Sequence, residues 1–111
     1  MAQITYDQWK ELKMRVGKVV KVERIPKTEK LYKLQVDIGG QKQVQIVSSL
    51  VPYYEEEEIL GKQIVVLVNL EPATFGGEVS EGMLLCAETE DADKCVILRP
   101  EREMPTGTPV T

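Results

Sequence analysis

The sequence predicts an all-β fold: one small barrel of five strands, with a short helix inserted between the third and fourth strands. Three observations support this prediction. With 111 residues, the chain is long enough for one domain with its own core and too short for two. Apolar residues make up 42% of the chain and charged residues 29%, a balance typical of a folded soluble protein. The apolar residues fall mainly in short β-branched runs, which glycine and proline separate.

A short helix is predicted before the first strand. Thr5 is a suitable N-cap, and Gln8, three residues later, completes a capping box. Tyr6, Trp9 and Leu12 follow at spacings that place them on one helical face. We expect Trp9 to anchor this helix on the core, a more ordinary role for it than stacking on a nucleic-acid base.

The first half of the chain reads as three strands. A β-branched run over residues 16–25 forms the first strand, and Pro26 ends it. Residues 32–38 alternate cleanly between apolar and polar, and the turn sequence "GGQ" over residues 39–41 leads into a third strand of the same pattern. The apolar side should face the core, and the polar side should face water or a ligand. That polar side carries Lys33, Gln35, Gln43 and Gln45.

The second half continues with a helix and further strands. Residues 50–62 read as one helix, with Pro52 in its first turn, Gly61 as its C-terminal cap and four glutamates facing solvent. The remaining elements are expected in this order: a central strand over residues 63–70, a long loop over 71–82, a strand over 83–88, a turn, a short strand over 96–100 and a loop-like tail.

This order of elements is that of the OB-fold, a partly open five-stranded barrel. Such barrels bind ligands on the face of strands 2 and 3 and in the loops that join strands 1 and 2 and strands 4 and 5. We predict a single domain over residues 1–111, with the barrel over about 13–88 and a C-terminal β extension over about 89–111.

Residue usage argues against catalysis. The chain has no histidine, which removes the commonest general base and the commonest transition-metal ligand. Cys86 and Cys95 match neither a zinc-binding pattern nor a CxxC pair, so we expect no metal and no cofactor. Both are expected to be buried packing thiols, and whether they ever pair stays open. We therefore predict a binding protein rather than an enzyme.

Charge is distributed unevenly along the chain. Residues 1–50 hold 10 Lys and Arg against 5 Asp and Glu, whereas residues 51–111 hold 4 against 13. A surface that binds nucleic acid should therefore draw its charge from the first half. No apolar run is long enough to span a membrane, and the N-terminal residues do not resemble a signal peptide, so we expect a cytoplasmic location.

Three segments, in this order, resemble the tRNA-binding OB-fold domain family. They are "MRVGKVVKVERIPKTEKLYKLQVDIG" (14–39), "YYEEEEILGKQIVVLVNLEPA" (53–73) and "SEGMLLCA" (80–87). The family includes free-standing bacterial proteins, C-terminal parts or separate beta chains of methionyl-tRNA synthetases, and the EMAP-II cytokines. The resemblance implies a homodimer that recognises the general shape of tRNA rather than a base sequence, beside a methionyl-tRNA synthetase. Because a five-stranded barrel does not need the C-terminal extension, we expect this extension to mediate the dimerisation, with Val96, Ile97 and Leu98 taking part.

The resemblance also implies a set of RNA-binding residues. Lys30 and Lys33 match the family's "K-L-Y" entry to strand 2, Asn69 matches the end of strand 4, and Ser80, Gly82 and Met83 match the loop between strands 4 and 5. We add Lys27 on the basis of charge. The predicted RNA-binding residues are Lys27, Lys30, Lys33, Asn69, Ser80, Gly82 and Met83.

Two alternatives stay open at this loop. Gly82 could make the turn, Ser80 could satisfy its backbone and Met83 could fill the barrel mouth, instead of contacting RNA. Phe75 could stack on a base or plug the barrel end. Many relatives carry Lys or Arg before the serine, whereas this chain has the uncharged and acidic sequence "ATFGGEV". The positive surface has therefore moved to the loop between strands 1 and 2, or RNA affinity is reduced and a protein partner docks instead.

Overall fold

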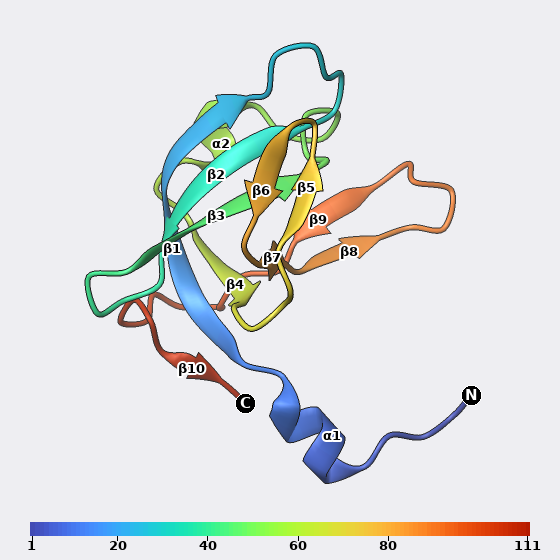
Figure 1. The fold of residues 1–111 in the computed structure, drawn as a ribbon, viewed down its shortest axis with the longest axis vertical. Coiled ribbons are helices and arrows are strands. Elements are labelled where there is room, and N and C mark those ends of the chain that lie inside the picture. Colours follow the sequence, from blue (N-terminus) through green and yellow to red (C-terminus); the bar gives the residue numbers. More distant parts are fainter.

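The computed structural model describes all 111 residues, and the elements follow the predicted order (Figure 1). The elements are α1 (Tyr6–Glu11), β1 (Met14–Arg24), β2 (Tyr32–Asp37), β3 (Gln43–Ser48), α2 (Glu56–Ile59), β4 (Gln63–Leu67), β5 (Ala73–Phe75), β6 (Glu78–Ser80), β7 (Met83–Leu84), β8 (Cys86–Glu88), β9 (Cys95–Ile97) and β10 (Pro109–Val110). Neither helix has the length and apolar character that crossing a bilayer requires.

The barrel is one antiparallel sheet in the order β3-β2-β1-β4-β7. The long strand β1 serves both halves, because its first part pairs with β4 and its last part with β2. A bulge between Val19 and Lys21 interrupts the pairing of β1 with β2, and a bulge of this kind bends and twists a strand. The barrel closes where the Glu81 N–H donates to the Gln45 carbonyl on β3 (2.7 Å). The predicted OB-fold is confirmed.

The core lies inside the barrel and follows the predicted alternation. Tyr32, Leu34 and Val36 of β2 are buried, whereas the residues between them are only half-buried. Ile46 of β3 and Ile64 of β4 meet them from neighbouring strands, and both are fully buried. Burial of each such side chain stabilises the fold by about 1.5–3 kcal/mol.

The N-terminal helix differs from the prediction in its packing. The capping box forms as expected, with the Gln8 N–H donating to Thr5 Oγ1 and the Thr5 N–H donating to Gln8 Oε1. However, α1 has no buried residue, and Trp9 is 39% exposed, so the expectation that Trp9 anchors the helix on the core was wrong. Figure 1 shows α1 just before the start of β1, outside the barrel. The apolar residues of this short helix therefore have no core within reach.

The second helix is shorter than predicted. Residues 50–62 contain only four α-helical residues, Glu56–Ile59, because Leu50 is already buried in the core and its carbonyl accepts the N–H groups of Tyr53 and Tyr54. Pro52 therefore lies in a turn and not in a first helical turn. Gly61 does follow the helix with φ +80°, the left-handed conformation expected of a glycine cap.

The segment predicted as a loop over residues 71–82 contains the hairpin of β5 and β6. Its two-residue turn is Gly76–Gly77, and both glycines have positive φ, as a tight hairpin turn requires. The strand predicted over residues 83–88 is divided at Leu85, since β7 continues the barrel whereas β8 leaves it to pair with β9.

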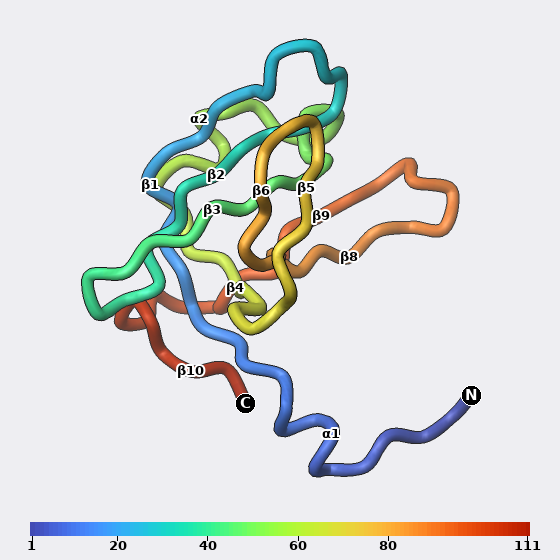
Figure 2. The backbone as a smooth tube through the Cα atoms, in the orientation of Figure 1, coloured from blue at the N-terminus to red at the C-terminus, as the bar shows by residue number.

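The C-terminal extension is part of the same packed unit. Cys95 and Ile97 of β9 are buried and belong to the barrel's core cluster, whereas Val96 is 56% exposed. The tail is not loop-like throughout, because β10 pairs with the start of β1. The Val16 N–H donates to the Thr108 carbonyl (2.9 Å), and the Gly107 N–H donates to the Val16 carbonyl (2.7 Å). Figure 2 shows this tail passing beside the turn between β2 and β3.

Candidate nucleic-acid interface

The loop between β1 and β2 presents cations without carboxylate partners. The Ile25 N–H donates to the Leu31 carbonyl (3.1 Å), which closes the base of the loop, and the Thr28 hydroxyl donates to the Ile25 carbonyl (2.7 Å). Lys27 and Lys30 are both exposed, and neither forms an ion pair. Lys27 has φ +67°, which marks a sharp backbone turn that carries its side chain outward. These two ammonium groups are therefore available for phosphate oxygens.

Lys33, at the start of β2, has a carboxylate partner. Its Nζ lies 3.1 Å from Oε1 of Glu78 on β6, and the side chains are 24% and 35% exposed. This pairing could not be predicted from local sequence patterns, because the two residues are 45 positions apart. A phosphate that approaches Lys33 must therefore compete with Glu78. This predicted RNA-binding residue is partly neutralised in the free chain.

The polar face of β2 and β3 was expected to meet water or a ligand, but the chain's own β5–β6 hairpin lies over part of it. The side-chain amide of Gln45 donates to the Val79 carbonyl (2.8 Å), and its Oε1 accepts a hydrogen bond from the side-chain amide of Gln35 (2.9 Å). The Gln45 N–H donates to Oε1 of Glu81 (2.7 Å). Hydrogen bonds therefore dock the hairpin on β3, and a ligand meets the outer side of this hairpin first.

Ser80 and Gly82 lie inside this docked segment. Ser80 is only 2% exposed; its Oγ accepts the Val47 N–H (3.0 Å) and donates to the Gly82 carbonyl (2.7 Å). Gly82 is buried, and a Cβ at this position would clash with the carbonyl oxygen of Leu67. Both residues therefore shape the loop in the free chain, in line with the alternative in which Gly82 makes the turn and Ser80 satisfies its backbone.

Met83 and Phe75 meet at a small apolar pocket. The pocket has a volume of about 280 Å³. Its wall is formed by Leu31, Val47, Ser48, Ser49, Leu50, Phe75, Met83, Leu84, Cys86, Glu88 and Cys95. Met83 is half-buried, and Phe75 is 41% exposed on β5, so Phe75 does not plug the barrel end. A thioether and an aromatic ring beside an opening form a surface on which a flat base could stack.

Asn69 holds the N-terminal helix. Its Oδ1 accepts the Lys13 N–H (3.0 Å), and its Nδ2 donates to the Glu11 carbonyl (2.7 Å). The Val68 N–H donates to the Lys13 carbonyl (2.8 Å). Both functional groups of the Asn69 amide are used, so this side chain fixes the junction of α1 with the barrel. The structure therefore separates Asn69 from the loop cations.

Comparison of the chain with known proteins identifies its family. A family model described as "Putative tRNA binding domain" matches residues 14–109. The chain belongs to this tRNA-binding domain family. It is 41% identical over 108 residues to a methionine–tRNA ligase of Clostridium tetani and 50% identical over 107 residues to one of Methanocorpusculum labreanum. It spans only 17% and 15% of the length of these two ligases.

Solved structures agree with the family assignment. A MetRS-related protein from Pyrococcus horikoshii is 39% identical with a TM-score of 0.92, and the match covers 100% of both chains. The chaperone CsaA from Bacillus anthracis is 30% identical with a TM-score of 0.88, over 99% of this chain and 100% of that one. This chain therefore shares its fold both with a MetRS-related protein and with a protein named as a chaperone.

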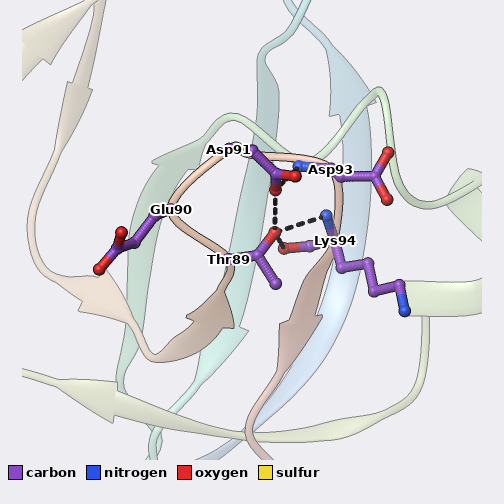
Figure 3. A pocket seen from close by; sticks show the side chains of 5 residues that line it. All are labelled: Thr89, Glu90, Asp91, Asp93 and Lys94. Atoms are coloured by element: carbon purple, nitrogen blue, oxygen red, sulfur yellow. Dashed lines mark hydrogen bonds between the residues drawn. The ribbon is translucent and has the colours of Figure 1, made fainter.

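An acidic loop joins β8 to β9 in this member of the tRNA-binding domain family. Figure 3 shows Thr89, Glu90, Asp91, Asp93 and Lys94 around a shallow pocket in it. The Asp91 carboxylate accepts the Asp93 N–H (3.0 Å) and the Thr89 hydroxyl (2.8 Å), and these hydrogen bonds lower the pKa of Asp91. The carboxylate thus satisfies the loop itself, and the loop is not a surface for a polyanion.

The two thiols lie on the paired strands β8 and β9. Cys95 is buried, as expected, and Cys86 is half-buried. Burial raises the pKa of Cys86 to about 12, and the neighbouring thiol of Cys95 adds to this shift. A thiol with so high a pKa stays protonated near neutral pH and is a poor nucleophile. Packing is the role that these contacts support.

Proposed function

We propose that this chain is a non-catalytic tRNA-binding protein that recognises the general shape of tRNA. Its match to the tRNA-binding domain family over residues 14–109 carries the proposal. Lys27 and Lys30 form no ion pair and are therefore free to bind phosphates. Phosphate contacts do not distinguish one base sequence from another, as recognition of shape requires. Its likeness to parts of two methionine–tRNA ligases supports a role as a beta-subunit-like or trans-acting partner of methionyl-tRNA synthetase. Such a role would place it in the cytoplasm.

The seven proposed site residues have different roles. Lys27 and Lys30 contact phosphates directly, and Lys33 joins them once its pair with Glu78 opens. Met83 offers a base an apolar contact at the mouth of the pocket. The other three act through the loop and helix that they hold in place, as their hydrogen bonds or close packing indicate. These three are Asn69, Ser80 and Gly82.

The number of cations explains why the proposed form is a homodimer. Each phosphate neutralised by Lys or Arg contributes about 0.7–0.9 to the slope of log affinity against log salt. Two or three such contacts from one loop give weak binding at physiological salt. A symmetric dimer presents the loop twice, which raises the apparent affinity if one tRNA contacts both copies.

The dimer interface that we propose combines α1 with the C-terminal extension. A groove of about 280 Å³ lies between them, and Tyr6, Trp9, Leu12 and Val110 are among the residues that line it. Trp9 and Leu12 are 39% and 42% exposed, although they are large apolar side chains on one helical face. We keep the proposed division of the chain into a barrel over about 13–88 and a dimerisation extension over about 89–111. To this interface we add α1 as a second dimerisation element.

Fluorescence anisotropy of labelled, unfractionated tRNA tests the function. We expect micromolar or tighter binding at low salt, weakening as salt rises, and much weaker binding by the Lys27→Ala/Lys30→Ala variant. Lys62→Ala/Lys94→Ala removes the same charge elsewhere and should bind like the unmodified chain. The absence of binding at low salt would refute the proposal.

A second candidate function is a protein-interaction or chaperone-like module with little RNA affinity. The likeness to the chaperone CsaA from Bacillus anthracis and the neutralisation of Lys33 by Glu78 favour it. A binding assay with a fluorescently labelled, reduced and unfolded polypeptide distinguishes the two functions. Binding of this polypeptide without binding of tRNA would support the second function.

A further inference from the structure

A basic groove lies at the opposite end of β2 from the loop that carries Lys27 and Lys30. It has a volume of about 570 Å³ and lies between the start of β1, the turn that joins β2 to β3, and the tail before β10. Lys13, Arg15 and Lys42 line it, and none of its lining residues is acidic. In a chain of net charge −4, this groove gathers three cations around one hollow.

The floor of the groove is a direct contact between two stretches of backbone. Gly39 has φ +85° and Gly107 has φ +93°; a Cβ on Gly39 would lie 2.9 Å from the Thr106 carbonyl oxygen and 3.0 Å from Gly107 Cα. Any larger residue at either position would push the tail away. The Arg15 guanidinium donates to the Gly107 carbonyl (3.0 Å), which holds the tail against the turn. The hollow is thus a built feature of the fold.

The cations of the groove have no carboxylate partners. The two ion pairs in the chain join Lys21 to Glu23 and Lys33 to Glu78, so both lie elsewhere. The nearest carboxylates along the chain are those of Glu11, two residues before Lys13, and Asp37, whose Oδ1 accepts the Gly39 N–H (2.8 Å).

The turn adds two neutral donors. The N–H groups of Gly40 and Gln41 make no hydrogen bond within the chain. A Cβ on Gly40 would meet no atom within 4 Å, so the approach to this backbone is open. Of the two, Gly40 lines the groove, and an unpaired N–H beside unpaired ammonium groups is the set of donors that a phosphate oxygen requires.

We infer that this groove binds the phosphodiester backbone of RNA and gives the chain a second contact with the tRNA of the proposed function, on which the inference rests. β2 has six residues, so the two basic regions lie about 20 Å apart along the strand. Two separated backbone contacts read the path of the RNA strands and not their bases. This is how a small barrel with few cations recognises shape.

The test compares three double variants in the tRNA anisotropy assay across salt concentrations. The variant Lys13→Gln/Lys42→Gln removes two of the three positive charges that line the groove. It keeps Arg15, which holds the tail. Lys62→Gln/Lys94→Gln removes the same charge elsewhere, and Lys13→Arg/Lys42→Arg keeps the charge in the groove. Lys13 and Lys42 are exposed, so their replacement should leave the fold intact. Because Lys13 also lines the groove between α1 and the C-terminal extension, light scattering must show that each variant keeps the oligomeric state of the unmodified chain. Circular dichroism checks that each variant is folded.

Two lost phosphate contacts should lower the salt slope by about 1.5. If phosphate contacts contribute nothing at 1 M salt, each one is worth roughly 5-fold at 0.15 M, so the groove variant should bind tRNA on the order of 20-fold more weakly. The Lys62→Gln/Lys94→Gln and arginine variants should bind like the unmodified chain.

The outcomes distinguish the two claims. If Lys27→Ala/Lys30→Ala weakens binding whereas the groove variant matches Lys62→Gln/Lys94→Gln, the groove is not an RNA contact and the proposed function stands. If the unmodified chain binds no tRNA at low salt, both claims fail.

Discussion

Replacing Ser80 by alanine tests whether this serine supports the loop or touches RNA. Ser80 is 2% exposed, and its hydroxyl joins the Val47 N–H to the Gly82 carbonyl. Alanine removes both hydrogen bonds and leaves a buried N–H on Val47, which is itself 1% exposed. An unsatisfied buried group costs about 1–3 kcal/mol, so we expect the free energy of unfolding to fall by roughly 2 kcal/mol. At about 4 °C per kcal/mol for a domain of this size, the Tm should fall by roughly 8 °C.

The assay is urea denaturation followed by circular dichroism, together with tRNA anisotropy at a low temperature where the variant is still folded. We expect a lower urea midpoint and a tRNA Kd within about threefold of the unmodified chain. Ser49→Ala is the control, since Ser49 is exposed and its hydroxyl makes no hydrogen bond. An unchanged urea midpoint with much weaker tRNA binding would refute the reasoning, because the hydroxyl would then serve RNA and not the loop.

Three further predictions follow from the contacts of the chain. Glu78→Gln releases Lys33 and should strengthen tRNA binding by roughly 5-fold at 0.15 M salt, as one more phosphate contact would; an equal gain in Glu90→Gln would mean that net charge alone acts. Trp9→Glu places a charge on the exposed face of α1 and should give monomers by light scattering with an unchanged circular dichroism spectrum; a persisting dimer would exclude this face. Because the pKa of Cys86 is raised from 9.0 to about 12 in the folded chain, folding favours the protonated thiol, so stability should fall as pH rises from 9 to 12. Urea midpoints should fall less over this range in Cys86→Ala, and equal slopes would contradict the assignment.

Features that depend on neighbouring residues could be predicted from the sequence. The capping box of Thr5 and Gln8 involves four consecutive positions, and it forms as expected. The alternation over residues 32–38 assigns one face of β2 to the core, and the glycines at 39–40 turn the chain into β3. The Gly76–Gly77 turn also carried a local signal, since two glycines between β-forming residues are typical of a two-residue hairpin. The loop interpretation overlooked it.

Features that depend on polar contacts between distant residues could not be predicted. Gln45 belongs to a polar face by its alternation, but the alternation does not say whether water, a ligand or the chain's own hairpin covers that face. The pairing of Lys33 with Glu78 joins residues 45 positions apart through one ion pair. Trp9 was misplaced for a related reason, because helical periodicity identifies an apolar face without saying what packs against it.

The bonds between β1 and the tail impose an order on folding during synthesis. Val16 obtains hydrogen-bond partners from Gly107 and Thr108, which a ribosome adds more than ninety residues later. Until those residues emerge, the first part of β1 keeps an unpaired edge, and such an edge can pair with another nascent chain. The barrel therefore reaches its finished form only after residue 108 is made, and on a crowded polysome its first strand is the segment most in need of protection.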